Sequence, residues 1–372
     1  MVQVRAQTTS QWNAKPGDHD GRGTMTDEAP VDTQGKEAIR AAVVGAGSWG
    51  TALALLLHEN GHRVRLWTHD ETVVDEVARL GENRTYLPGV SVPDEIQVFS
   101  RIDQVVSQAD LVVSVSPSQF VGPVMETVVP HIRSDALVVS ASKGIETENL
   151  QTMHRVLSLL LPEGMAKRIC VLSGPSFAAE VARKEPTAVV VASASRDARR
   201  QAQQLFTSDT FRVYTNPDVL GVELGGAVKN VIALAAGVAA GLEFGHNTRA
   251  ALMTRGLAEM TRLGVAMGAS QATFSGLAGM GDLVLTCTGE LSRNRTVGTR
   301  LARGESLEEI LSATKSVAEG VRTATAVRRL AREHNVEMPI TQQVCRMLQG
   351  EVRPRDAVHE LMTRDPKPER WS

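Results

Sequence analysis

The segment from residue 38 to residue 70, AIRAAVVGAGSWGTALALLLHENGHRVRLWTHD, constrains the fold more than any other part of the chain. A short apolar run is followed by a glycine-rich turn, a long stretch rich in alanine and leucine, and a second apolar run that begins near Val64. This order predicts a strand, a turn, a helix and a second strand, which together form one βαβ unit. The fold class that such units indicate is α/β, with a doubly wound parallel sheet.

The glycines of this turn predict a dinucleotide-binding site. Gly45 permits the tight turn, Gly47 lets the backbone approach a pyrophosphate, and Gly50 lets the following helix lie close to the strand. Phosphate oxygens would then meet the N–H groups at the helix N-terminus. Glycines at this spacing are a weak signal alone, but the strand before them and the helix and strand after them make it specific.

The end of the second strand bears on which nicotinamide cofactor is accepted. An acidic residue is expected there to bind the ribose 2′-hydroxyl of NAD, but Thr68 and His69 occupy the region and Asp70 lies just beyond it. A hydroxyl and an imidazole tolerate a 2′-phosphate. We therefore expect NADP to be accepted at least as well as NAD.

Further strands are predicted at ADLVVSVSP, DALVVSASKGIE and CVLSGPSFAAEVA, because nearly continuous apolar runs are typical of parallel strands buried on both faces. Ligands of open α/β sheets bind beyond the carboxyl ends of strands, and Lys143 falls at such an end. The turn from Ser173 to Ser176 follows another strand and faces the same crevice. We expect it to cap a helix that starts near Phe177.

A chain of 372 residues exceeds the size at which one core stops growing, so two domains are expected. From about Leu220 the pattern changes from strands to long helical segments. Residues 1–37 are polar, without apolar periodicity, and are predicted to be a disordered tail. The predicted organisation is a tail over 1–37, a Rossmann-like domain over 38–219, a helical domain over 220–356 and a C-terminal tail over 357–372.

Composition excludes several classes of partner. With 40 Lys and Arg against 42 Asp and Glu, no bulk charge favours nucleic acid or an anionic membrane. The stretch VIALAAGVAAGL is shorter than a membrane span requires, and the N-terminus lacks the apolar core of a signal peptide. Three separated cysteines show neither metal-ligand spacing nor a disulfide framework. We expect a cytoplasmic protein with a small-molecule substrate, no integral membrane segment and no metal.

Lys229 lies in the small, apolar run ELGGAVKNVIALAAG, which is predicted to be helical. A buried ammonium without a partner would lose several units of pKa, so the lysine either extends to solvent along its alkyl stem or has a counter-charge. Asp282, which follows a turn formed by Gly276, Gly279 and Gly281, offers that counter-charge.

Ser292 opens a cluster with Arg293, Asn294 and Arg295. A serine N-cap, a helix N-terminus and a guanidinium group together suit a phosphate dianion. A capped, solvated start of a helix would explain the same residues without any ligand.

The blocks GAGSWG, SKGIE, SGPSFA, GGAVKN, GLAGMGDLVLTC, SRNR and VAEG occur in the order and approximate spacing seen in bacterial-type NAD(P)-dependent glycerol-3-phosphate dehydrogenases. The resemblance covers about Ala38 to Arg353. It implies a Rossmann domain followed by a helical domain, a homodimer, and reversible reduction of dihydroxyacetone phosphate to sn-glycerol 3-phosphate for phospholipid biosynthesis.

The resemblance also implies roles for individual residues. Lys229 resembles the family's proton donor and acceptor, with Lys143 and Asp282 as its catalytic partners. The residues that match substrate contacts are Lys143, Gly174, Ser176, Lys229, Asp282, Thr286, Ser292, Arg293 and Asn294. The residues that match cofactor contacts are Gly45, Gly47, Ser48, Trp49, Gly50, His69, Lys143, Ala178, Arg293, Val317 and Glu319.

Two other functions fit parts of the pattern. Another Rossmann hydroxy-acid dehydrogenase, such as ketopantoate reductase, needs a cation for a carboxylate but not a serine-capped arginine cluster. A non-catalytic NAD(P)-binding module needs the glycine turn but no proton donor, so the placement of Lys143, Lys229 and Asp282 argues against it.

Overall fold

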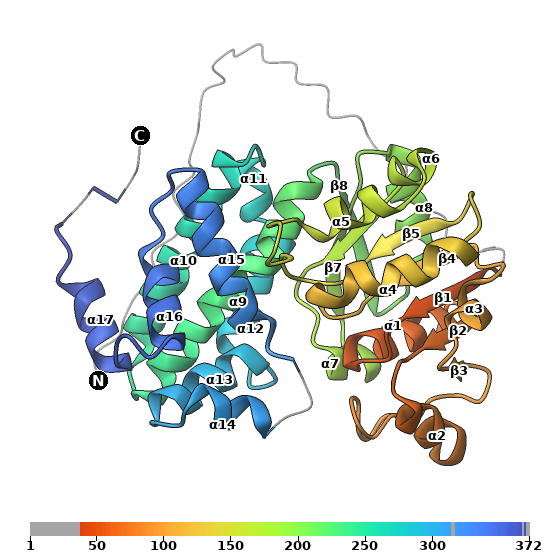
Figure 1. The fold of residues 1–372 in the computed structure, drawn as a ribbon, viewed down its shortest axis with the longest axis horizontal. Coiled ribbons are helices and arrows are strands. Elements are labelled where there is room, and N and C mark those ends of the chain that lie inside the picture. The colour runs from red at the N-terminus through yellow and green to blue at the C-terminus, as the bar shows by residue number, and fades with distance from the viewer. Residues whose placement is uncertain (1–37, 314–316, 367, 370–372) are drawn as a thin grey trace, which may run out of the picture. The chain divides into compact units, whose positions relative to one another are not determined.

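The structure is a computed structural model that describes residues 38–313, 317–366 and 368–369 (Figure 1). All of these residues belong to one compact unit. The tail predicted over 1–37 lies outside the described residues.

Eight strands form a single sheet in the order β3-β2-β1-β4-β5-β6-β7-β8. All neighbouring strands are parallel except β6 and β7, which are antiparallel. This arrangement confirms the predicted α/β Rossmann fold. The strands are β1 (Arg40–Val44), β2 (Arg63–Trp67), β3 (Gln97–Phe99), β4 (Leu111–Ser114), β5 (Leu137–Ser140), β6 (Cys170–Ser173), β7 (Thr187–Ala192) and β8 (Phe211–Asn216).

Both faces of the central strands β1, β4, β5 and β6 are buried, which explains their continuous apolar runs, whereas buried and exposed residues alternate along β2 and β8. Successive side chains of a strand point to opposite faces. Ala41 and Val43 of β1 accordingly join one core, while Ala42 and Val44 join another. The helices of this half are α1 (Ser48–Glu59), α2 (Glu71–Leu80), α3 (Ile102–Val106), α4 (Val121–Val128), α5 (Met153–Leu160), α6 (Glu163–Ala166), α7 (Ala178–Ala182) and α8 (Arg196–Phe206).

The described part of the chain after residue 218 contains helices and no strand, as predicted. Its helices are α9 (Val219–Gly241), α10 (His246–Ala266), α11 (Gln271–Phe274), α12 (Asp282–Thr288), α13 (Arg293–Ala302), α14 (Leu307–Ser312), α15 (Glu319–Glu333), α16 (Pro339–Leu348) and α17 (Pro354–Met362). Helix α17 crosses the domain boundary predicted after residue 356. The division of the chain at 219/220 into two domains stays a prediction.

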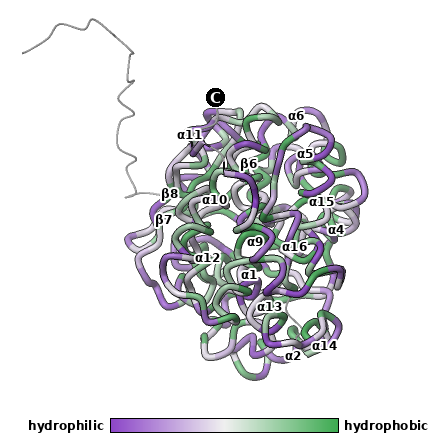
Figure 2. Tube along the Cα trace, turned by 90° about the vertical axis from the view of Figure 1, so that its left-hand side faces the viewer, coloured by the Kyte–Doolittle hydropathy of each residue, from purple (hydrophilic) through white to green (hydrophobic). Residues whose placement is uncertain are grey.

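Helix α9 is the central element of the helical half and is hydrophobic along most of its length (Figure 2). It is longer than the apolar stretch recognised in the sequence, and by length and composition it could cross a membrane. However, 83% of its apolar window is buried inside the protein, against α10, α12, α13 and α15. Its hydrophobicity is therefore that of a core helix.

Candidate active site

Lys229 projects from the middle of α9, and its side chain is only 9% exposed. Its Nζ donates to Oδ1 of Asp282 at 2.6 Å and to Oγ1 of Thr286 at 2.8 Å. The Thr286 hydroxyl in turn donates to the Asp282 backbone carbonyl at 2.6 Å. The lysine is therefore buried with a counter-charge and does not extend to solvent.

Asp282 opens α12 directly after a π-helical segment, Leu277–Gly281, where the sequence predicted only a glycine turn. Its carboxylate is 99% buried and contacts two cations, because Lys143 donates to Oδ2 at 2.7 Å. Lys143 follows β5 and also donates to the Gly174 carbonyl at 2.8 Å. The structure thus joins strand ends of the sheet to the helical half through one carboxylate.

The electrostatics of this triad follow from burial and charge. Burial lowers the pKa of Lys229 to about 8, although the neighbouring Asp282 carboxylate opposes that shift and Lys143 adds to it. Burial raises the pKa of Asp282, but the charges of Lys143 and Lys229 outweigh it and hold that pKa below its usual value. An ammonium has three N–H groups, and each lysine uses two of them here. One N–H of each remains for a ligand.

The predicted phosphate cluster lies at the start of α13. Ser292 is the N-cap, and its hydroxyl accepts from Arg295 N at 3.3 Å. The Arg293 side chain reaches solvent. The protein around its guanidinium group still removes part of its hydration and lowers its pKa, and the charge of Glu319 opposes that shift. An exposed guanidinium beside the first N–H groups of a helix can bind a phosphate from solvent.

Asn294 has a structural role that the sequence did not reveal. Its Nδ2 donates to Asn230 Oδ1 at 2.9 Å, and its Oδ1 accepts from Gly320 N at 2.9 Å. The side chain is buried and links α9, α13 and α15. Its predicted contact with substrate stays a prediction.

The glycine turn fits a dinucleotide. Gly45 has φ +128°, a conformation open to glycine, and a Cβ on Gly50 would lie 1.8 Å from the Gly45 carbonyl oxygen. A Cβ on Gly47 would meet no atom within 4 Å, so the space beside it is open. Gly47 caps α1 without any side-chain hydrogen bond, which leaves first-turn N–H groups available for a pyrophosphate.

Trp49 and His69 stand near the same edge of the sheet. Within the described part of the chain, the buried Nε1 of Trp49 has no hydrogen-bond partner, and Ser48 beside it is half-buried. His69 is exposed, with its ring 6.5 Å from that of Trp67. Asp70 accepts from Thr72 N at 3.0 Å and so serves as the N-cap of α2.

The remaining predicted cofactor residues lie on two elements. Glu319 opens α15 and accepts from Ser118 N at 2.9 Å and from Ser118 Oγ at 2.5 Å. Val317 precedes it and is 36% exposed, whereas Ala178 opens α7 and is half-buried. Sequence reasoning missed Ser118, although it follows β4 at the carboxyl edge where Lys143 was found.

The expectation that Ser176 helps to cap a helix was wrong. Phe177 is the N-cap of α7, with no side-chain cap, and the Ser176 hydroxyl donates instead to the Gly174 carbonyl at 3.0 Å. That carbonyl is two residues back, so a local turn satisfies the hydroxyl before the helix begins. Ser176 and Gly174 nevertheless lie at the strand end that Lys143 contacts.

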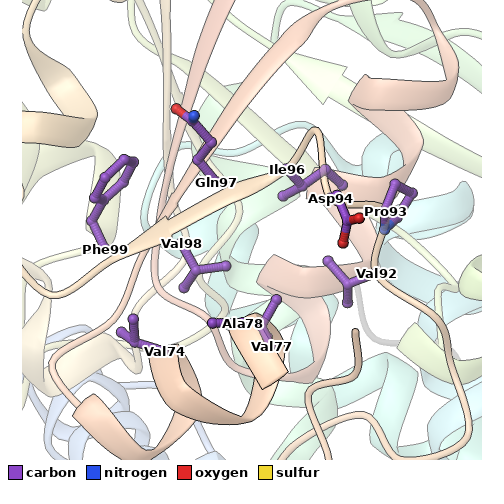
Figure 3. A pocket seen from close by; sticks show the side chains of 10 residues that line it. All are labelled: Val74, Val77, Ala78, Val92, Pro93, Asp94, Ile96, Gln97, Val98 and Phe99. Atoms are coloured by element: carbon purple, nitrogen blue, oxygen red, sulfur yellow. The ribbon is translucent and has the colours of Figure 1, made fainter. Parts of the chain in front are cut away.

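A pocket of about 320 Å³ lies away from this cluster, between α2 and β3 (Figure 3). Its lining includes Val74 and Val77 of α2, Val98 of β3 and the polar residues Asp94 and Gln97. It contains none of the predicted site residues.

Comparisons with known proteins identify the family of the chain. A family model described as NAD-dependent glycerol-3-phosphate dehydrogenase N-terminus matches residues 40–199, and one for the C-terminus of the same enzyme matches residues 218–359. A glycerol-3-phosphate dehydrogenase [NAD(P)+] of Geobacter metallireducens is 55% identical over 88% of this chain and 98% of that protein. The corresponding protein of Geobacter sulfurreducens is 52% identical over 89% and 99%.

Solved structures lead to the same family. The crystal structure of glycerol-3-phosphate dehydrogenase from Coxiella burnetii is 39% identical, covers 88% of this chain and 99% of its own, and superimposes with a TM-score of 0.83. A ketopantoate reductase from Ralstonia eutropha shares the fold alone, with 16% identity and a TM-score of 0.52. The chain therefore belongs to the family of NAD(P)-dependent glycerol-3-phosphate dehydrogenases.

Proposed function

We propose that this protein reversibly reduces dihydroxyacetone phosphate to sn-glycerol 3-phosphate with Lys229 as the proton donor. The observation that carries the assignment is the pair of ammonium groups, each with one free N–H, held on opposite oxygens of the Asp282 carboxylate. A bound reduced nicotinamide would supply the hydride that C2 of the ketone receives.

Negative charge develops on the C2 oxygen as the ketone is reduced. Lys229 donates a hydrogen bond to that oxygen and then transfers its proton to it, while Lys143 adds a second positive charge. Asp282 and Thr286 fix the direction of the lysine Nζ, and Arg293 with the N-terminus of α13 holds the phosphate. Binding energy from the phosphate is thereby used to orient the carbonyl.

We further propose Gly47, the first turn of α1 and Trp49 as the pyrophosphate and nicotinamide-cofactor contacts, with His69 near the adenosine ribose. Asp70 uses Oδ1 as a helix cap, and the residues directly after β2 are Thr68 and His69 rather than an acid. The proposed cofactor is accordingly NADP or NAD. We also propose that the protein acts as a homodimer in the cytoplasm.

The test follows the absorbance of NADPH and NADH with purified protein and dihydroxyacetone phosphate. Unphosphorylated dihydroxyacetone and ketopantoate serve as control substrates. Oxidation that requires the phosphate supports the proposal. Oxidation with ketopantoate instead, or none by protein that binds NADPH, would refute it.

A further inference from the structure

Two adjacent glycines, Gly225 and Gly226, lie one turn before Lys229 on α9, at the point where the helix passes between the sheet and the π-helical segment. A Cβ on Gly225 would lie 2.5 Å from the Ala278 carbonyl oxygen and 3.0 Å from its carbon. A Cβ on Gly226 would lie 2.7 Å from Ser173 Oγ. A methyl group on Gly225 would meet backbone atoms of Ala278, and one on Gly226 would overlap the buried hydroxyl of Ser173.

These two close contacts are with the two elements that lead to the partners of Lys229, the π-helical segment and β6. Ala278 belongs to the π-helical segment that ends at Asp282. Ser173 is the last residue of β6 and precedes Gly174, whose carbonyl accepts from Lys143. The stem of Lys143 would itself lie 3.6 Å from a Cβ on Gly226. The spacing on each side of α9 thus sets the distance from Lys229 to one of its partners.

An apolar cluster next to the two glycines holds α9 at a fixed distance from β6 and from the π-helical segment. Val171, Val190 and Ala192 of the sheet form one buried cluster with Val222 of α9 and Ala278. Val222 lies one turn before Gly226 on α9, and Val171 lies two residues before Ser173 on β6. The buried cluster is therefore next to the close contact between Gly226 and Ser173. Close packing of this cluster leaves no slack by which α9 could move without opening a cavity.

We infer that Gly225 and Gly226 are positioning residues for the reaction, because they fix α9 between β6 and the π-helical segment so that Lys229 reaches Asp282 and Lys143 together. The inference rests on the proposed function. A bulkier residue at position 225 would move Lys229 away from Asp282. One at position 226 would move it away from Lys143.

The two substitutions should shift the titration of Lys229 in opposite directions. The charged or titratable groups that act on it are Asp282 and Cys287 of α12 and Lys143 after β5. Losing contact with Asp282 lowers the pKa of Lys229, whereas losing the repulsion of Lys143 raises it. Destabilisation alone would not produce opposite shifts.

The experiment measures kcat and the pH profile of kcat/KM for ketone reduction by Gly225→Ala and Gly226→Ala. A displacement of about 1 Å at a reacting group can cost about 100-fold in rate, and we expect a loss of that order for Gly225→Ala. In wild type, kcat/KM should fall at alkaline pH as Lys229 loses its proton, and we call this fall the alkaline limb. The limb should move to lower pH in Gly225→Ala and to higher pH in Gly226→Ala. In the double variant Ser173→Ala/Gly226→Ala the clashing hydroxyl is gone, so the wild-type limb should return.

Gly241→Ala is the matched control, because its Cβ would lie 2.6 Å from the Thr299 carbonyl oxygen at the far end of the same helix. It should lower the thermal midpoint but leave the limb in place. Wild-type limbs in both glycine variants, or equal behaviour of Gly225→Ala and Gly241→Ala, would overturn the inference. Wild-type protein without phosphate-dependent turnover would instead refute the proposed function.

Discussion

Lys143 and Lys229 donate to opposite oxygens of one carboxylate, although they come from different halves of the chain. Each lysine compensates the burial of Asp282, and Asp282 keeps two ammonium groups close together despite their repulsion. The cluster carries a net charge of +1 before substrate binds, which favours an anion. This charge arrangement underlies the first two predictions.

Replacing Lys229 by alanine removes the proposed proton donor. General acid catalysis contributes about 100- to 10,000-fold, so kcat for reduction should fall by that factor. The NADPH dissociation constant, measured by fluorescence titration, should stay within a few-fold of wild type. Lys167→Ala, at an exposed lysine paired with Glu163, is the control and should retain full activity. A Lys229→Ala enzyme with more than about a tenth of wild-type kcat would exclude this lysine from the proposed chemistry.

The pH profile should report the ionisation of Lys229. Reduction needs the ammonium form, so kcat/KM for the ketone should fall as pH rises through about 8. In the oxidation direction the neutral amine is the base, and the same group should give a rising limb. Asp282→Asn removes the carboxylate that opposes the effect of burial, and its reduction limb should therefore move to lower pH. A limb unchanged in Asp282→Asn would contradict this assignment.

Arg293→Ala tests the phosphate site. A hydrogen bond to a charged group contributes about 1.5–3 kcal/mol, which corresponds to a rise in KM for the phosphorylated ketone of about 10- to 100-fold. Inhibition by inorganic phosphate should weaken in parallel. Arg300→Ala, on the same helix but paired with Glu305, should leave both constants unchanged. Equal KM values in the two variants would place the phosphate elsewhere.

Gly47→Ala separates cofactor binding from folding. Gly47 has φ −67° and open space around it, so alanine should leave the thermal midpoint of the unliganded protein unchanged. The added methyl group occupies the approach of the pyrophosphate, and the dissociation constant of NADPH should rise by about tenfold or more. Gly50→Ala should behave differently, because its Cβ clashes with the Gly45 carbonyl and destabilises the fold itself. Unchanged NADPH affinity in Gly47→Ala would remove Gly47 from the site.

Glu259 makes stability depend on pH at a distance from the site. It caps the start of α16 by accepting from Ile340 N at 2.6 Å and from Thr341 N at 3.2 Å, and burial raises its pKa to about 7. The folded state therefore holds a proton that the unfolded state releases from about pH 4.5 upward. Stability should fall between pH 4.5 and 7, by about 3 kcal/mol at 1.36 kcal/mol per unit. Thermal midpoints of Glu259→Gln should show a smaller fall across this range, and an identical fall would contradict the assignment.

Much of the fold follows from local patterns in the sequence. The glycine turn, the strands β1, β2, β4, β5 and β6 and the helical second half were predictable because each depends on residues close together in the chain, whereas β3, β7 and β8 were not predicted. The pairing of Lys229 with Asp282, 53 residues away, was predictable for another reason, since a buried ammonium needs a counter-charge and a glycine turn placed a carboxylate in the helical half.

Other features depend on contacts that form only when the chain has folded. Ser118 meets Glu319, and Asn294 meets Asn230 and Gly320, across long separations in sequence that no local pattern records. The reversal between β6 and β7 was also invisible, because an apolar run does not indicate the direction in which its strand lies. The Ser176 cap failed because a carbonyl two residues away competed for the hydroxyl.

The strand reversal restricts insertions and deletions in α9. Asn216 ends β8 beside Ala192, which pairs with Val171 near the start of β6, so the chain leaves the sheet at the edge opposite the site. Helix α9 must then run back along β6 before Lys229 can reach the catalytic edge. Each residue of a helix adds about 1.5 Å and turns the chain by about 100°. Losing a single residue between Val222 and Lys229 would leave the lysine both short of Asp282 and facing another direction, so the length of β6 fixes the residue spacing of that segment.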